Sequence, residues 1–229
     1  MATSAEQRQT GSAEPRGTAL ALILATERLV AEHGSAGISL RQIAQAAGAG
    51  NVSAVQYHFG SREALLLAVL QYRMTAINAR RLDQLARLET AGALLDQRGL
   101  VGSLVYPLTA ELNPRPEGNY YLRFIERRTR EGISGAEMLG SLLAGWMRTE
   151  KLLRETIAAL PAAIAEFRIT LMRDQAISGM AAIEAGLGKR SSRRDMALHI
   201  ELLVDAAVAT LGGPVSPETL NVLKAAPGA

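Results

Sequence analysis

The chain has 229 residues, of which 48% are hydrophobic and 4% aromatic, enough apolar material for one large domain or for a small and a larger one. Its 25 Lys and Arg against 22 Asp and Glu give a net charge of +3, which permits a nucleic-acid partner without requiring one. The absence of cysteine excludes a disulfide scaffold, thiolate catalysis and any metal site with cysteine ligands.

The sequence also lacks the features of a membrane or exported protein. No apolar run approaches the roughly 18 residues of a membrane span, and the N-terminus MATSAEQRQT has no apolar core of a signal peptide. The three histidines, His33, His58 and His199, are too scattered for a metal cluster, so we expect neither a metal nor another cofactor. These observations predict a cytoplasmic protein. Ala and Leu dominate its apolar residues, which favours packed helices over a sheet.

The first third of the chain predicts an arm, two helices and a turn. Residues 1–17 show no periodicity and are expected to be a disordered arm. A first helix is predicted over residues 18–33, where apolar residues recur every three or four positions. A second is predicted over residues 40–47, after Ser39, a favourable N-cap. The turn Gly48-Ala49-Gly50 follows, and its two glycines tolerate the positive φ angles of a tight corner.

A third helix is predicted over residues 51–59. Its inner stripe is expected to be Val52, Val55 and Phe59, which are spaced three or four positions apart. Its opposite face has no acid and carries mainly hydrogen-bonding side chains: Asn51, Ser53, Ala54, Gln56, Tyr57 and His58. Gln can bond adenine in a bidentate way, and Ser or Asn can bond bases or phosphates.

Two short helices joined by a glycine turn form the pattern of a helix-turn-helix. From His33 through Arg62 the chain contains no acidic residue, as binding to polyanionic DNA requires. The stretch from Ser39 to Arg62 is therefore a candidate DNA-binding element. An ordinary polar surface helix would show the same pattern, so this alternative stays open.

The remaining sequence predicts further helices. A long fourth helix is expected from Ser61 to about residue 90, with Arg80 and Arg81 exposed on it. A helix over residues 93–112, kinked at Pro107, and a loop over residues 113–119 follow. The next helix, over residues 120–130, is expected to turn four arginines outward: Arg123, Arg127, Arg128 and Arg130. Later helices are predicted up to residue 160, over 161–185 and over 195–211, with a linker over 186–194 and a loose tail at the end.

The segment NVSAVQYHFGSREALL resembles the end of the DNA-binding domain of TetR-family bacterial transcriptional regulators. The resemblance extends over about residues 18–70 and includes SLRQIAQAAG, the Tyr-His-Phe ending and the Ser-Arg-Glu start of the fourth helix. The turn Gly48-Ala49-Gly50 is one residue longer than the family pattern, which bears on where the third helix begins and on the role of Asn51.

This resemblance implies an all-α fold with an N-terminal three-helix DNA-binding domain over residues 18–62. It implies a helical ligand-binding and dimerisation domain over residues 63–213 and leaves residues 214–229 as a C-terminal tail. It also implies that Ser39, Arg41 and Arg62 contact phosphates and that Tyr57 and His58 grip the DNA backbone. The residues that would face the bases are Asn51, Ser53, Ala54 and Gln56.

The resemblance further implies a homodimeric repressor that a small apolar or amphipathic ligand releases from its operator. In the family the last two long helices form a four-helix bundle between subunits. The candidate ligand-binding residues are Leu104, Tyr106, Tyr121, Phe124, Trp146, Met147, Phe167 and Met172. Aromatic and Met residues at helical spacing are also typical of an ordinary core.

Two other functions stay open: a non-specific DNA-binding protein, and a helical small-molecule-binding protein without sequence-specific DNA recognition. An enzyme is not expected, because the C-terminal region shows no acid pair, no nucleophile beside a base and no metal cluster at catalytic spacing.

Overall fold

The computed structural model describes residues 15–132, 136–186 and 192–225, and within these ranges the chain is helical apart from its turns and connections. The N-terminal helices are α1 (Gly17–His33), α2 (Leu40–Ala46), α3 (Ser53–Phe59) and α4 (Arg62–Thr90). The C-terminal helices are α5 (Gln97–Val105), the 3-10 segment η1 (Tyr106–Leu112), α6 (Tyr121–Glu131), the 3-10 segment η2 (Ala136–Leu143), α7 (Ala144–Thr156), α8 (Ala162–Gly186), α9 (Arg193–Gly212) and α10 (Pro217–Ala225). The predicted all-α fold is confirmed.

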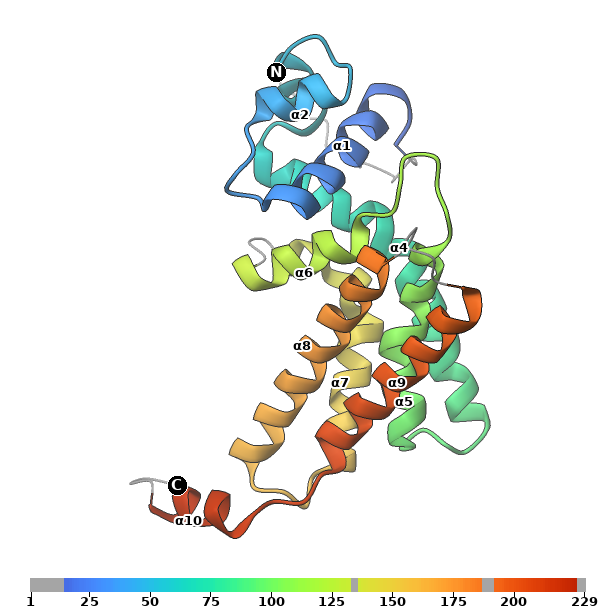
Figure 1. The fold of residues 1–229 in the computed structure, drawn as a ribbon, viewed down its shortest axis with the longest axis vertical. Coiled ribbons are helices and arrows are strands. Elements are labelled where there is room, and N and C mark those ends of the chain that lie inside the picture. The colour runs from blue at the N-terminus through green and yellow to red at the C-terminus, as the bar shows by residue number, and fades with distance from the viewer. Residues whose placement is uncertain (1–14, 133–135, 187–191, 226–229) are drawn as a thin grey trace, which may run out of the picture.

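The molecule is elongated, with α1 to α3 at one end and α10 at the other (Figure 1). The 29-residue helix α4 starts among the N-terminal helices and continues into the C-terminal ones. One continuous helix therefore connects both parts. Among the described helices none alone has the length and apolar character to cross a membrane, and only α9 and α10 taken together, across a 52° bend, pass that test.

A buried ion pair fastens α1 to α4. The carboxylate of Glu27 accepts hydrogen bonds from Nε and Nη2 of Arg73 at 2.7 and 3.0 Å, and both side chains are buried. Glu111 of η1 lies 3.8 Å from Arg73 and also binds Arg80 at 3.3 Å and Arg115 at 2.6 Å. This network compensates charges that would be costly to bury alone, and it joins the N-terminal helices to η1.

A second contact joins α6 to the N-terminal helices. Arg128 donates from Nη1 to the hydroxyl of Ser35 at 3.2 Å, and Glu131 accepts the backbone N–H of Ser35 at 2.9 Å. Burial raises the pKa of Glu131, but the hydrogen bonds from Ser35 and Arg128 outweigh this effect and leave the pKa lowered. The predicted exposure of Arg128 is wrong, because the loop after α1 covers it and leaves it 5% exposed.

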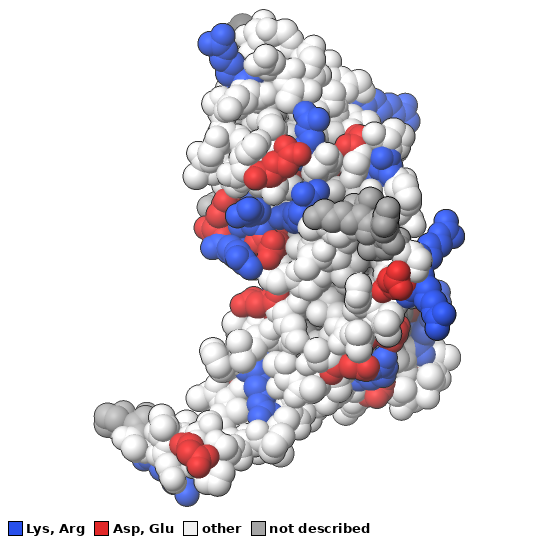
Figure 2. Space-filling view, in the orientation of Figure 1, with Lys and Arg blue, Asp and Glu red and all other residues white. Residues whose placement is uncertain are grey.

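Other charged side chains lie at the surface close to this contact. On the face drawn in Figure 2, acidic and basic side chains gather in a mixed belt near α6, where the N-terminal helices meet the C-terminal ones.

Residues 97–112 form two elements rather than the single kinked helix predicted. Pro107 has no N–H, so the carbonyl of Ser103 loses its helical donor and α5 gives way to η1. Arg81 replaces that donor, with Nε bonded to Ser103 O at 3.0 Å and Nη2 to Leu104 O at 3.3 Å. Arg81 is accordingly 1% exposed, and its predicted exposure is wrong.

The C-terminal end also differs from the prediction. Where a loose tail is expected, α10 begins at Pro217 and is capped by Ser216, whose hydroxyl accepts the N–H of Thr219 at 3.2 Å. None of the residues of α10 is buried in its own chain. Most of the predicted arm (residues 1–14) and of the predicted linker (residues 187–191) lies outside the described residues.

Candidate nucleic-acid interface

Helix α2 is set by a capping box at Ser39. The Ser39 hydroxyl accepts the N–H of Gln42 at 3.3 Å, and the Ser39 N–H donates to the Gln42 side chain at 2.7 Å. The hydroxyl also donates to the same amide oxygen at 2.8 Å. Both donors of Ser39 are thus engaged within α2, while Ile43 and Ala44 are buried and Arg41 is exposed.

The turn after α2 needs both of its glycines. Gly48 has φ 67° and Gly50 has φ 21°, as the predicted tight corner requires. The helix after the turn begins at Ser53 rather than residue 51, so Asn51 and Val52 belong to the turn. Val52 is 38% exposed and its predicted inward position is wrong, whereas Val55 is fully buried and Phe59 is half-buried.

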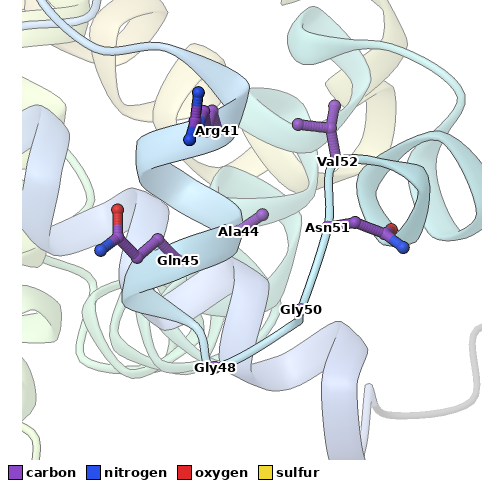
Figure 3. A pocket seen from close by; sticks show the side chains of 7 residues that line it. All are labelled: Arg41, Ala44, Gln45, Gly48, Gly50, Asn51 and Val52. Atoms are coloured by element: carbon purple, nitrogen blue, oxygen red, sulfur yellow. The ribbon is translucent and has the colours of Figure 1, made fainter.

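The turn runs beside α2 and leaves a hollow between them (Figure 3). The hollow has a volume of about 580 Å³ and is lined by Arg41, Ala44, Gln45, Gly48, Gly50, Asn51 and Val52. It combines one cation with two side-chain amides and contains no acid. This set of donors suits phosphate or base oxygens.

The outer face of α3 is centred on Tyr57. Successive helical residues are turned by about 100°, which places Ser53 and Tyr57 opposite the buried Val55. Tyr57 is 85% exposed, and its ring meets that of His58 edge-on at 5.0 Å. Gln56 and His58 are also exposed, and Ala54 is half-buried. The four-residue spacing from Ser53 to Tyr57 was the available signal that Tyr57 projects from the middle of this face.

The side chain of Arg62 is less exposed than its position at the start of α4 suggests. It is half-buried, and its Nε and Nη2 atoms are buried without a hydrogen-bond partner among the described residues. The next residue, Glu63, pairs with Arg128 at 3.6 Å. Arg41 is therefore the more exposed arginine of this surface.

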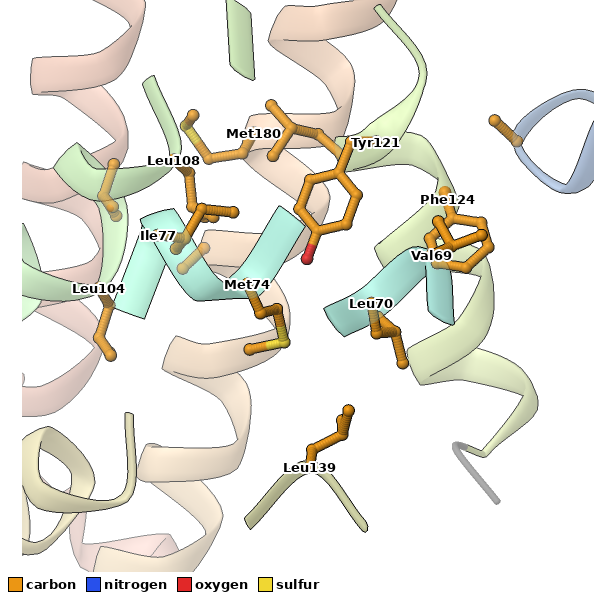
Figure 4. Close-up of a cluster of buried hydrophobic side chains, with 14 of the residues drawn as sticks. Val69, Leu70, Met74, Ile77, Leu104, Leu108, Tyr121, Phe124, Leu139 and Met180 are labelled. Carbon is orange, nitrogen blue, oxygen red and sulfur yellow. The ribbon is translucent and has the colours of Figure 1, made fainter. Parts of the chain in front are cut away.

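The eight candidate ligand-binding residues do not all come together. Leu104, Tyr121, Phe124 and Met172 are buried in the core cluster, and part of this cluster is drawn in Figure 4. Tyr106 and Trp146 are half-buried at its edge. Met147 and Phe167 are each 64% exposed, so within one chain they line no internal site with the others. Helical spacing alone did not show which of these apolar residues face the core of the chain and which face outward.

Residues 22–69 match the family model of the bacterial regulatory proteins of the tetR family. This stretch of the chain belongs to the tetR family. The match covers most of α1, all of α2 and α3, and the first part of α4, so its end falls inside a helix that continues into the C-terminal part. No match was found among the curated proteins.

Membership of the tetR family makes the protein a DNA-binding transcriptional regulator. The helix-turn-helix of the family is formed by α2 and α3, so the surface around Tyr57 belongs to the DNA-binding domain.

Proposed function

We propose that the protein is a homodimeric repressor that reads an operator with α3 and leaves it when a small molecule binds among the C-terminal helices. The observation that carries this proposal is the exposed, acid-free surface formed by α2, the glycine turn and α3. That surface offers hydrogen-bond donors and acceptors to a major groove, and α4 connects it directly to the C-terminal helices.

The contacts divide by position on this surface. Ser53, Ala54 and Gln56 face the bases from α3, and Tyr57 lies between them. Asn51 approaches from the turn. The phosphates are held by Arg41, His58 and Arg62, whereas Ser39 acts mainly as the cap that orients α2. With only two arginines on this surface, hydrogen bonding and a second subunit supply much of the affinity.

The second subunit is expected on the outer face of α8 and α9. Phe167 and Leu171 are 64% and 43% exposed on α8, and Leu198 and Leu202 are 56% and 52% exposed on α9. Each pair is four residues apart and so lies on one side of its helix. Two such apolar faces fit a two-fold interface, which suits paired operator half-sites.

Release from DNA follows if the ligand favours one arrangement of the two parts over another. Candidate ligand contacts remain Leu104, Tyr106, Tyr121, Phe124, Trp146 and Met172 around the buried core. A movement of the helices around the ligand would be transmitted to α1 by the Glu27–Arg73 pair. It would be transmitted to the loop after α1 by the hydrogen bonds of Arg128 and Glu131 with Ser35. The spacing between the two recognition helices of the dimer would then change.

Replacing Gln56 with Ala is expected to relax sequence preference at one base position of each half-site, at a cost of roughly 1–3 kcal/mol. Replacing Arg41 with Ala is the matched control, because loss of a phosphate contact should weaken all duplexes alike and lower the salt slope by about one unit. Both are measured by titrating fluorescent operator and random duplexes. If Gln56→Ala weakened both duplexes equally, α3 would not read bases through this residue and non-specific DNA binding would be favoured.

A further inference from the structure

Arg81 is a buried cation without a carboxylate partner among the described residues. Its Nε and Nη2 atoms bond the carbonyls of Ser103 and Leu104, but its Nη1 atom is buried and has no hydrogen-bond partner there. The ring of Trp146 lies over the guanidinium, 5.2 Å from it. Burial lowers the pKa of Arg81 to about 10, so the group is still protonated at neutral pH. A buried donor of this kind normally has an acceptor.

Tyr121 brings a second polar group to the same core. The residue is 3% exposed, and its ring stacks on that of Phe124 with the ring centroids 6.2 Å apart. Burial raises the pKa of Tyr121, as do the carboxylates of Glu111 and Glu27, while the positive charges of Arg81 and Arg73 oppose that effect. The phenol is therefore neutral and can donate a proton to an acceptor.

The neighbouring polar side chains satisfy one another. Ser103 and Thr149 share a hydrogen bond of 3.0 Å, and Asn78 binds the N–H of Gly145 at 3.0 Å and the carbonyl of Ser141 at 3.1 Å. Around them the core is apolar, and the Tyr121 hydroxyl points into the cluster that contains Met74, Ile77 and Leu108 (Figure 4). The unpartnered Nη1 atom of Arg81 thus lies among side chains that are apolar or already paired.

We propose that Arg81 and Tyr121 bind the carboxylate of an amphipathic organic acid whose apolar part packs among the side chains of α4, η1 and α8. This inference rests on the proposed function and specifies its ligand class. A carboxylate supplies the acceptor that the Nη1 atom of Arg81 lacks, whereas a neutral apolar molecule leaves that atom without a partner.

The segment η2 packs against the same apolar cluster, and we expect it to move when such a molecule binds. Leu139 of η2 belongs to the same cluster, and the bond from Asn78 to Ser141 holds η2 on α4. Its helical geometry is interrupted at Gly140, with φ 34° and ψ −112°. A short, broken 3-10 segment is displaced more easily than a regular helix.

Trp146 is the only tryptophan of the chain, so its fluorescence reports directly on the Arg81 site. The full-length protein is titrated with octanoate, decanoate, dodecanoate and 4-phenylbutyrate, and with the primary amide of each. We expect at least one acid to change the fluorescence saturably and to bind at least tenfold more tightly than its amide. Arg81→Gln should abolish that preference, and Tyr121→Phe should weaken the acid severalfold.

Arg87→Gln is the control, since Arg87 lies on the same helix with its side chain 77% exposed, and it should bind the acid like the wild type. If Arg81→Gln does not fold, as judged by circular dichroism, Tyr121→Phe removes one hydroxyl and carries the test. The proposal is overturned if no acid binds more tightly than its amide, or if the two variants keep the full preference.

Operator binding separates this proposal from the function on which it rests. Saturable acid binding that depends on Arg81, in a protein that does not prefer any duplex, supports the anion site and contradicts the repressor. Specific DNA binding that amides and acids release equally well supports the repressor and overturns the anion site.

Discussion

Replacing Glu27 with Ala is expected to lower the free energy of unfolding by about 3–5 kcal/mol, because the substitution leaves Arg73 buried without its bidentate partner. Arg73 is 5% exposed, and its remaining acid, Glu111, is 3.8 Å away and is shared with Arg80 and Arg115. Glu111 therefore compensates only part of the loss. The change is measured by urea unfolding followed by circular dichroism.

Asp83→Ala is the matched control, because the Asp83–Arg87 pair joins side chains that are 59% and 77% exposed and should cost at most about 1 kcal/mol. The double variant Glu27→Leu/Arg73→Met removes both charges and should recover much of the stability lost in Glu27→Ala. Equal losses for Glu27→Ala and Asp83→Ala would show that the buried pair does not hold α1 on α4.

Replacing Leu171 with Asp is expected to weaken dimerisation by at least about a hundredfold. In a two-fold interface the substitution occurs twice. Leu171 is 43% exposed in its own chain, so each copy loses less than half of the about 1.5–3 kcal/mol of full leucine burial, and each adds a charge that must lose its water. Operator binding should fall with it, because a monomer contacts a single half-site. Sedimentation equilibrium measures the first effect and operator titration the second.

Leu95→Asp is the control for this variant. Leu95 is 55% exposed, but it lies in the turn before α5 rather than on the outer face of α8 and α9. Its replacement should leave both dimerisation and operator binding unchanged. A Leu171→Asp protein that remains dimeric would place the subunit interface elsewhere.

The helix-turn-helix could be predicted from the sequence because its signals are local. Ser39 caps α2 within three residues, and the glycines of the turn have the positive φ angles that the corner requires. The start of α3 was missed by two residues. Val52 has the spacing of a residue on the inner face of a helix. The longer turn places it before the first residue of α3, and the spacing of apolar residues does not show where a turn ends and a helix begins.

The buried arginines could not be predicted, because their partners are distant in sequence. Arg81 bonds carbonyls 22 and 23 positions away that Pro107 and the end of α5 leave without donors, and Arg128 bonds Ser35 across 93 positions. The exposure of Phe167 could not be predicted either. A helix face that packs inside one chain and a face exposed for another subunit have the same spacing.

Two copies of the chain are expected to read paired half-sites through α3. Selecting binding sites for the full-length protein from a pool of random duplex DNA tests it most directly. We predict enrichment of an inverted repeat whose half-site centres lie about 10 base pairs, or a multiple of that distance, apart. Recovery of no preferred sequence, or of one unrepeated half-site, would contradict the account.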